Sequence, residues 1–309
     1  MPSRSPVLVR TALSVAALGA LVVFGTQFVQ SRWEQSPKME VAGDPSNANG
    51  PAEGTSEQHP SGPSLAALLG SNVAIDRNDP VQMRILADYG AVFVTTAVAP
   101  PTVVFSSEDQ VRLWQSSVDI EKESVGGITI ELQAPAMKAL LAARAEAKAA
   151  RLDITPRGAD GARRGYDDTV RLWTSRVDPA LDHWVARNRL TPAERDRIRS
   201  LSPRDQIPEV LALEKRGVYF STGFDKSILY SVAAPGTSQH LSMLALDVSQ
   251  FENAEVRRIL SRHGWFQTVV SDLPHFTYLG VAEETLPSLG LKKVTSGGRV
   301  FWIPDLSLL

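Results

Sequence analysis

The feature that most constrains this chain is an uncharged, apolar stretch close to its N-terminus. No Asp, Glu, Lys or Arg occurs between Arg10 and Arg32. As a helix rising about 1.5 Å per residue, residues 11–31 would extend roughly 30 Å, which matches the hydrocarbon core of a bilayer. We therefore predict a membrane helix within residues 1–32, with Arg4 and Arg10 on the cytoplasmic side. A buried core helix is the alternative interpretation.

Cleavage of this stretch would decide whether the protein stays attached to the membrane. A cleavable signal needs small residues in an A-x-A-like arrangement after its apolar region. The sequence Val29-Gln30-Ser31 at that place is a poor cleavage site. We expect an uncleaved anchor, and hence a single-pass protein of the cytoplasmic membrane whose remaining residues lie outside. Cleavage would make it a secreted protein.

The composition divides the rest of the chain into a linker and one folded part. Residues 33–63 predict a flexible linker, because they are rich in Pro, Gly, Ser, Asn and Glu and offer little surface to bury. From residue 64 to Leu309 the composition is that of a globular domain. We expect a single domain over 64–309, with an N-terminal extension over 64–127 to which we assign no role.

The composition also excludes several classes of site and partner. Cysteine is absent, which rules out disulfides, iron–sulfur clusters, thiolate zinc sites and cysteine nucleophiles. The formal net charge is -2, without the basic excess typical of proteins that bind nucleic acid, so we expect no nucleic-acid partner. A histidine-based site must draw on five histidines, of which His59 lies in the predicted linker.

Hydrophobic periodicity predicts an α+β fold in which helices come first and strands cluster later. The predicted helices are 111–114, 134–151, 167–188 with an interruption near Pro179, one starting at Thr191-Pro192, 208–215 and 253–263. The predicted strands are 91–98, 103–105, 128–132, 228–233, 244–248, 275–279 and 300–303. This order favours helices packed on a small, mostly antiparallel sheet.

The most informative segment contains a turn, a histidine and an aspartate. Pro235-Gly236 marks the turn, His240 follows in a short extended stretch, and Asp247 ends the next predicted strand. A neutral imidazole and a carboxylate are good zinc ligands. The alternative is a loop histidine and a strand-end aspartate with no joint role.

A second segment, near residue 275, offers another carboxylate and another histidine. Asp272 lies three residues before His275, which begins a predicted strand. Pro274 fixes its own backbone and biases Leu273 to an extended shape, so the approach to the histidine is stiff. His275 is therefore a candidate third metal ligand, and Asp272 a candidate base.

Together the two segments resemble the zinc metallopeptidases of the VanY type. These are D-alanyl-D-alanine carboxypeptidases and related peptidoglycan endopeptidases, in the broader group that includes the lysostaphin-like enzymes and the hedgehog signalling domain. The family pattern is Ser-x-His, six residues, Asp, and later an acid, two residues and His. The matching residues in this chain, within about Leu132 to Gly280, are Ser238, His240, Asp247, Asp272 and His275.

The resemblance implies a zinc peptidase domain over 64–309, carrying its site on the small sheet. It implies zinc held by His240, Asp247 and His275, with a fourth position open as in catalytic sites. It further implies Asp272 as general base, and Ser238 as a hydrogen-bonding residue near the first ligand or the substrate. The arginine of the family's Arg-Ser-Tyr motif falls on Arg164, where it would steady a substrate carbonyl or carboxylate; a surface basic cluster is the alternative.

Three positions depart from the family pattern. Met243 stands where the family usually has glycine, Asp272 replaces a longer glutamate, and Thr169 replaces a glutamine. The expected reaction is hydrolysis of peptidoglycan stem peptides. The leading expectation is that the protein acts as a D-alanyl-D-alanine carboxypeptidase. An L-Ala-D-Glu type endopeptidase is the alternative within this class. A catalytically silent cell-wall binding or scaffold domain, retaining the metallopeptidase fold, is the alternative outside it.

Overall fold

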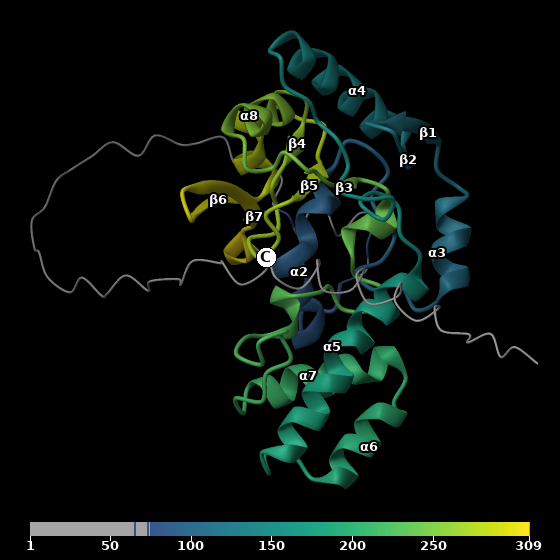
Figure 1. The fold of residues 1–309 in the computed structure, drawn as a ribbon, viewed down its shortest axis with the longest axis vertical. Coiled ribbons are helices and arrows are strands. Elements are labelled where there is room, and N and C mark those ends of the chain that lie inside the picture. The colour runs from purple at the N-terminus through teal and green to yellow at the C-terminus, as the bar shows by residue number, and fades with distance from the viewer. Residues whose placement is uncertain (1–64, 66–72, 74, 309) are drawn as a thin grey trace, which may run out of the picture. The chain divides into compact units, whose positions relative to one another are not determined.

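The computed structural model describes Leu65, Val73 and residues 75–308 (Figure 1). The predicted membrane helix over 1–32 and the predicted linker over 33–63 lie outside these residues. Within the described part of the chain, no helix combines the length and the apolar character needed to cross a bilayer.

Helices and small antiparallel sheets make up the described residues, so the predicted α+β class is confirmed. The α-helices are α2 (Pro80–Tyr89), α3 (Glu108–Gln115), α4 (Ala134–Ala149), α5 (Tyr166–Ala186), α6 (Pro192–Ser200), α7 (Pro203–Glu214) and α8 (Ala254–Arg262). The strands are β1 (Ile120–Val125), β2 (Ile128–Gln133), β3 (Ala245–Asp247), β4 (Trp265–Phe266), β5 (His275–Tyr278), β6 (Leu291–Ser296) and β7 (Arg299–Pro304). Short 3₁₀ helices are η1 (Gly90–Val94), η2 (Ile228–Tyr230), η3 (Gln239–Ser242), η4 (Glu283–Leu289) and η5 (Leu306–Leu308).

A three-stranded sheet in the order β3-β5-β4 lies at the centre of one apolar core. The helices α4 and α8 pack together beside this sheet, as Figure 1 shows near α8 and β4. Their apolar faces and those of the strands form one cluster, which includes Leu140, Leu246, Ile259, Trp265 and Phe276. Burial of these side chains fixes the position of β3 and β5, the two strands that carry Asp247 and His275.

A second core gathers the helices α5, α6 and α7, which lie together in Figure 1. Trp173 and Val177 of α5 are fully buried in it, as the helical stripe of apolar residues predicted. Contrary to the prediction, α5 runs through Pro179 without a break, and α7 begins at Pro203 and contains Pro208. Burial of the residues around each proline compensates for the missing backbone donor, and Ser202 caps the earlier start of α7.

Other predicted strands are wrong for identifiable reasons. The segments 91–98 and 228–233 contain the 3₁₀ helices η1 and η2, and 103–105 forms no strand. Most residues of η1 are buried. Its run of consecutive apolar residues is therefore explained by burial on all sides of a 3₁₀ helix, which the sequence pattern alone cannot distinguish from a buried strand. Conversely, β1 and β6 were not predicted, because their sequences IEKESV and LKKVTS are mostly polar and exposed in two-stranded hairpins.

Candidate metal centre

The sheet register places Asp247 directly opposite His275. Asp247 ends β3 as predicted, and its Cα pairs with that of His275 at the start of β5. Ladder bonds run from Val248 N to Pro274 O at 2.9 Å and from Tyr278 N to Leu244 O at 2.7 Å. The Asp247–His275 pair therefore occupies a non-hydrogen-bonded position, where side chains on opposite strands approach most closely.

The third member of the cluster, His240, comes from η3 and not from the extended stretch that was predicted. The turn before it requires glycine, because Gly236 has φ +78° and a Cβ there would lie 2.0 Å from Phe105 O. The 3₁₀ helix ends at Met243, which adopts the left-handed conformation with φ 56° and is fully buried. Left-handed backbone is the conformation that glycine reaches without strain, so the methionine at this position adopts an uncommon backbone conformation.

Three ligand atoms converge between these elements. The Nε2 atom of His240 lies 3.1 Å from Nδ1 of His275. Oδ1 of Asp247 lies 3.3 Å from the first nitrogen and 3.4 Å from the second. An ion with tetrahedral bonds of about 2.0–2.1 Å holds its ligand atoms roughly 3.3–3.4 Å apart. The cluster of His240, Asp247 and His275 could therefore hold a metal ion.

The outward nitrogens of both histidines are bound to oxygen atoms that can only accept. Nδ1 of His240 donates to Ala162 O at 2.8 Å, and Nε2 of His275 donates to Oε1 of Gln239 at 2.8 Å. In neutral rings these bonds leave the two inward nitrogens as lone pairs. Oδ1 of Asp247 is buried and has no hydrogen-bond partner among the described residues. Three acceptors thus face one another without a proton between them, which is an arrangement that a cation stabilises.

Burial and neighbouring charges keep His240 and Asp247 in the protonation states that a metal requires. His240 and His275 are 2% and 4% exposed. Burial lowers the pKa of His240 to about 4, although the charge of Asp247 opposes this shift. Burial alone would raise the pKa of Asp247, but the neighbouring His240 and His275 bring it well below its usual range. At neutral pH the cluster therefore offers a neutral His240 imidazole and an ionised carboxylate, the metal-binding forms of these groups.

Arg164 reaches the cluster from a loop that runs along the free edge of β3. Asp247 N donates to Gly161 O at 2.7 Å, and Arg157 N donates to Asp247 O at 2.9 Å, so residues 157–161 are tied to the strand. Nη2 of Arg164 then donates to Oδ2 of Asp247 at 2.9 Å. The same loop supplies the Ala162 carbonyl that holds His240. The predicted contact of Arg164 with substrate stays a prediction; its guanidinium donates to the Asp247 carboxylate and, through Nε, to Asp160 O at 3.0 Å.

Asp272 lies in the turn that leads into β5 and is partly exposed. Its backbone forms that turn, since Asp272 N donates to Val269 O and His275 N donates to Asp272 O, both at 3.1 Å. Burial and then the negative charge of Asp247 raise the pKa of Asp272 to about 6, against the opposing effect of His275 and Arg164. The carboxylate is therefore electrostatically coupled to the cluster without being one of the three converging groups.

Ser238 occupies a different environment from the metal cluster. It is buried at the start of η3. Together with Tyr89, Val103 and Phe105 it lines a small recess to which none of the three cluster residues contributes. Its predicted role as a substrate-binding residue stays a prediction.

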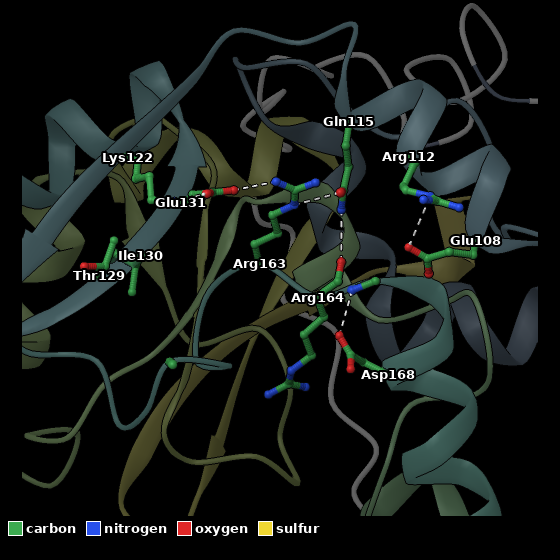
Figure 2. Close-up of a pocket in the computed structure, with 12 residues that line it drawn as sticks. Glu108, Arg112, Gln115, Lys122, Thr129, Ile130, Glu131, Arg163, Arg164 and Asp168 are labelled. Carbon is green, nitrogen blue, oxygen red and sulfur yellow. Dashed lines mark hydrogen bonds and ion pairs between the residues drawn. The ribbon is translucent and has the colours of Figure 1, made fainter.

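An open cleft of about 480 Å³ lies on the other side of Arg164. It is lined by α3, the β1–β2 hairpin, the loop before α5 and the first turn of α5. Figure 2 shows Arg163 reaching both Glu131 and Gln115 across this cleft, while the guanidinium of Arg164 turns away from Gln115. Sequence reasoning did not predict this cleft, because α3 and β1 fall in the extension over 64–127, to which no role was assigned.

Two contributors to the cluster escaped sequence reasoning. Gln239 fills the variable position of the Ser-x-His motif, and Ala162 acts only through its carbonyl oxygen. Comparisons with known proteins supply no relative, since no family model, no curated protein and no solved structure matches this chain. The resemblance to VanY-type peptidases therefore stays a prediction carried by the residues named above.

Proposed function

We propose that this chain is a zinc-dependent peptidase that hydrolyses peptide bonds in peptidoglycan stem peptides. The leading proposal for its activity is that of a D-alanyl-D-alanine carboxypeptidase. The single observation that supports the proposal is the convergence of two imidazole lone pairs and an unpartnered carboxylate oxygen at 3.1–3.4 Å. Two nitrogens and one oxygen at tetrahedral spacing suit zinc, and three protein ligands leave a fourth position open.

The bound metal would supply Lewis-acid activation of the scissile carbonyl and of the attacking water. Asp272 takes the proton from that water and passes it to the leaving amine. In the metal-free chain, burial and the charge of Asp247 raise the pKa of Asp272 to about 6, which makes it a stronger base than an ordinary aspartate while it stays ionised at neutral pH. Arg164 orients the Asp247 carboxylate, and its position beside the cluster supports the further role of steadying charge on the substrate.

The cleft beside Arg164 is the proposed binding place for the rest of the peptide. Its walls carry both signs of charge, with Arg112, Lys122 and Arg163 facing Glu108 and Glu131. Stem peptides carry both carboxylates and amino groups, so charges of both signs can orient them. The predicted anchor over 1–32 and linker over 33–63 support an extracytoplasmic position, in which the cell wall lies within reach of a tethered domain.

The test is mass spectrometry of purified muropeptides incubated with the full chain in detergent, with and without a chelator. Loss of the terminal D-alanine, abolished by the chelator and restored by zinc, is the expected result. Cleavage at another stem-peptide bond would replace the carboxypeptidase with an endopeptidase. Intact muropeptides in the presence of a zinc-loaded chain would contradict an enzyme and favour the silent binding domain.

A further inference from the structure

We propose that Gln239 is a positioning residue, which holds His275 in the tautomer that presents Nδ1 to the metal. The inference rests on the metal binding assumed in the proposed function, but not on the identity of the substrate. Gln239 contacts the proposed metal ligand His275 and is not proposed to contact the substrate.

The side-chain amide of Gln239 is the centre of a buried hydrogen-bond network. Its Oε1 accepts from Nε2 of His275 at 2.8 Å and from the hydroxyl of Thr277, and a third contact comes from Thr268 at 3.4 Å. Thr268 and Thr277 also share a hydrogen bond of 2.6 Å, and both are fully buried. Thr277 lies two residues after His275 on β5, so both side chains point to the same face of the sheet.

The opposite end of the amide fixes which atom faces the histidine. Nε2 of Gln239 donates to Tyr89 O at 2.8 Å. A flipped amide would place its oxygen against this carbonyl and its NH₂ group against His275, and would thereby lose several buried bonds at once. Gln239 is 2% exposed, so water cannot replace those bonds. The Tyr89 carbonyl therefore sets the direction of the amide, and the amide sets the tautomer of the ring.

The consequence for metal binding follows from the two nitrogens of one imidazole. With Oε1 of Gln239 as acceptor, the ring proton of neutral His275 stays on Nε2, and Nδ1 keeps the lone pair that points at His240 and Asp247. Without that acceptor, the proton can move to Nδ1 and occupy the direction of the metal. Loss of such an outer partner typically lowers metal affinity by about 10- to 100-fold.

A purely structural role for Gln239 would make different predictions. In that case the Gln239 amide only connects η3 to Tyr89 at the end of α2. Its removal would lower the free energy of unfolding without changing the tautomer of His275. Thr268→Val is the matched control, because it removes a buried hydroxyl from the same network but leaves the Gln239–His275 bond in place.

The test uses the full chain in detergent with Gln239→Leu, Gln239→Glu and Thr268→Val. Zinc affinity is measured by competition with a chelator, and the tautomer of His275 by ¹⁵N NMR of the metal-free chain. We expect Gln239→Leu to bind zinc about 10- to 100-fold more weakly. Gln239→Glu keeps an acceptor oxygen for His275 but loses the N–H that donates to Tyr89 O, so it should bind zinc more tightly than Gln239→Leu. Thr268→Val should keep the affinity of the unmodified chain.

Two results would overturn the proposal. One is a folded Gln239→Leu chain with the zinc affinity of the unmodified protein. The other is a metal-free unmodified chain whose neutral His275 carries its proton on Nδ1, a measurement that stands even if the leucine variant does not fold. Failure of the unmodified chain to bind zinc would instead contradict the proposed function, and the tautomer measurement separates the two failures.

Discussion

Arg164 donates a hydrogen bond from Nη2 to Oδ2 of Asp247 at 2.9 Å, while the other oxygen of that carboxylate faces the two histidines. Both side chains of the pair are less than one-fifth exposed, so the interaction is shielded from solvent. The arginine thereby fixes which carboxylate oxygen is offered to a metal, and its charge favours the ionised form of Asp247. Arg164 therefore orients the proposed metal ligand Asp247, in addition to any contact that it makes with substrate.

We predict that Arg164→Ala weakens zinc binding by about 10-fold or more, because Asp247 loses the partner that orients it. Arg164→Lys should retain part of the affinity, since it keeps the charge but not the geometry of the guanidinium. Arg163→Ala is the control, because Arg163 pairs with Glu131 in the cleft and not with the cluster. Calorimetric zinc titration checks this; equal affinities in the Arg164→Ala and Arg163→Ala chains would show that Arg164 does not act through Asp247.

Asp272→Asn should strongly reduce hydrolysis while zinc stays bound. The amide keeps the shape of the side chain but cannot accept the proton of the attacking water, which costs about 100- to 10,000-fold in kcat. Metal content and stem-peptide turnover of the same preparation check this prediction. Normal turnover by Asp272→Asn would remove Asp272 from the mechanism.

The pH profile of the unmodified enzyme reports on the same group. The base acts only when ionised, so kcat/KM should rise with pH and reach half of its maximum at or below about pH 6, the value to which burial and Asp247 raise the pKa of Asp272 in the metal-free chain. A bound cation offsets the charge of Asp247, and therefore moves this limb toward lower pH. A kcat/KM that falls as the pH rises from 4 to 6 would contradict a mechanism in which an ionised carboxylate acts as the base.

The contribution of His240 to the stability of the metal-free chain should fall as the pH drops from about 6.5 toward 4, while the raised pKa of Asp272 contributes in the opposite sense. Burial lowers the pKa of His240 to about 4, so between these values the unfolded chain binds more protons at this residue than the folded one. Between pH 7.5 and pH 5 this group alone should lower the free energy of unfolding by about 2 kcal/mol. Urea unfolding followed by tryptophan fluorescence measures it, and His240→Asn should remove this part of the pH dependence. An equal dependence in both chains would contradict the role of His240.

Gly236→Ala should destabilise the chain by about 3 kcal/mol or more, through left-handed backbone strain and overlap with the Phe105 carbonyl. Gly127→Ala is the matched control, because Gly127 also has a positive φ but would place its Cβ in open space. Only the strain of about 1–2 kcal/mol should appear there. Similar unfolding free energies for the two variants would show that the contact with Phe105 does not constrain the turn before His240.

Local signals in the sequence marked the cluster residues as candidates, and the resemblance to VanY-type peptidases joined them into one predicted ligand set. The Pro-Gly turn and the strand that follows it locate His240 and Asp247, and the proline before His275 stiffens the approach to β5. Gln239 and Ala162 could not be found in this way, since Gln239 acts on a ring that is distant in the sequence, and Ala162 acts through a backbone carbonyl that any residue could supply. The strand β1 was missed because its exposed face in a two-stranded hairpin is occupied by charged side chains.

The central claim is that His240, Asp247 and His275 hold one zinc ion, and metal analysis of the purified full chain tests it most directly. Inductively coupled plasma mass spectrometry should find about one zinc per chain, and His275→Ala should lose it while a His183→Ala control, at a partly exposed histidine outside the cluster, keeps it. A chain that binds no zinc after reconstitution, or a His275→Ala chain that keeps the full amount, would contradict the account.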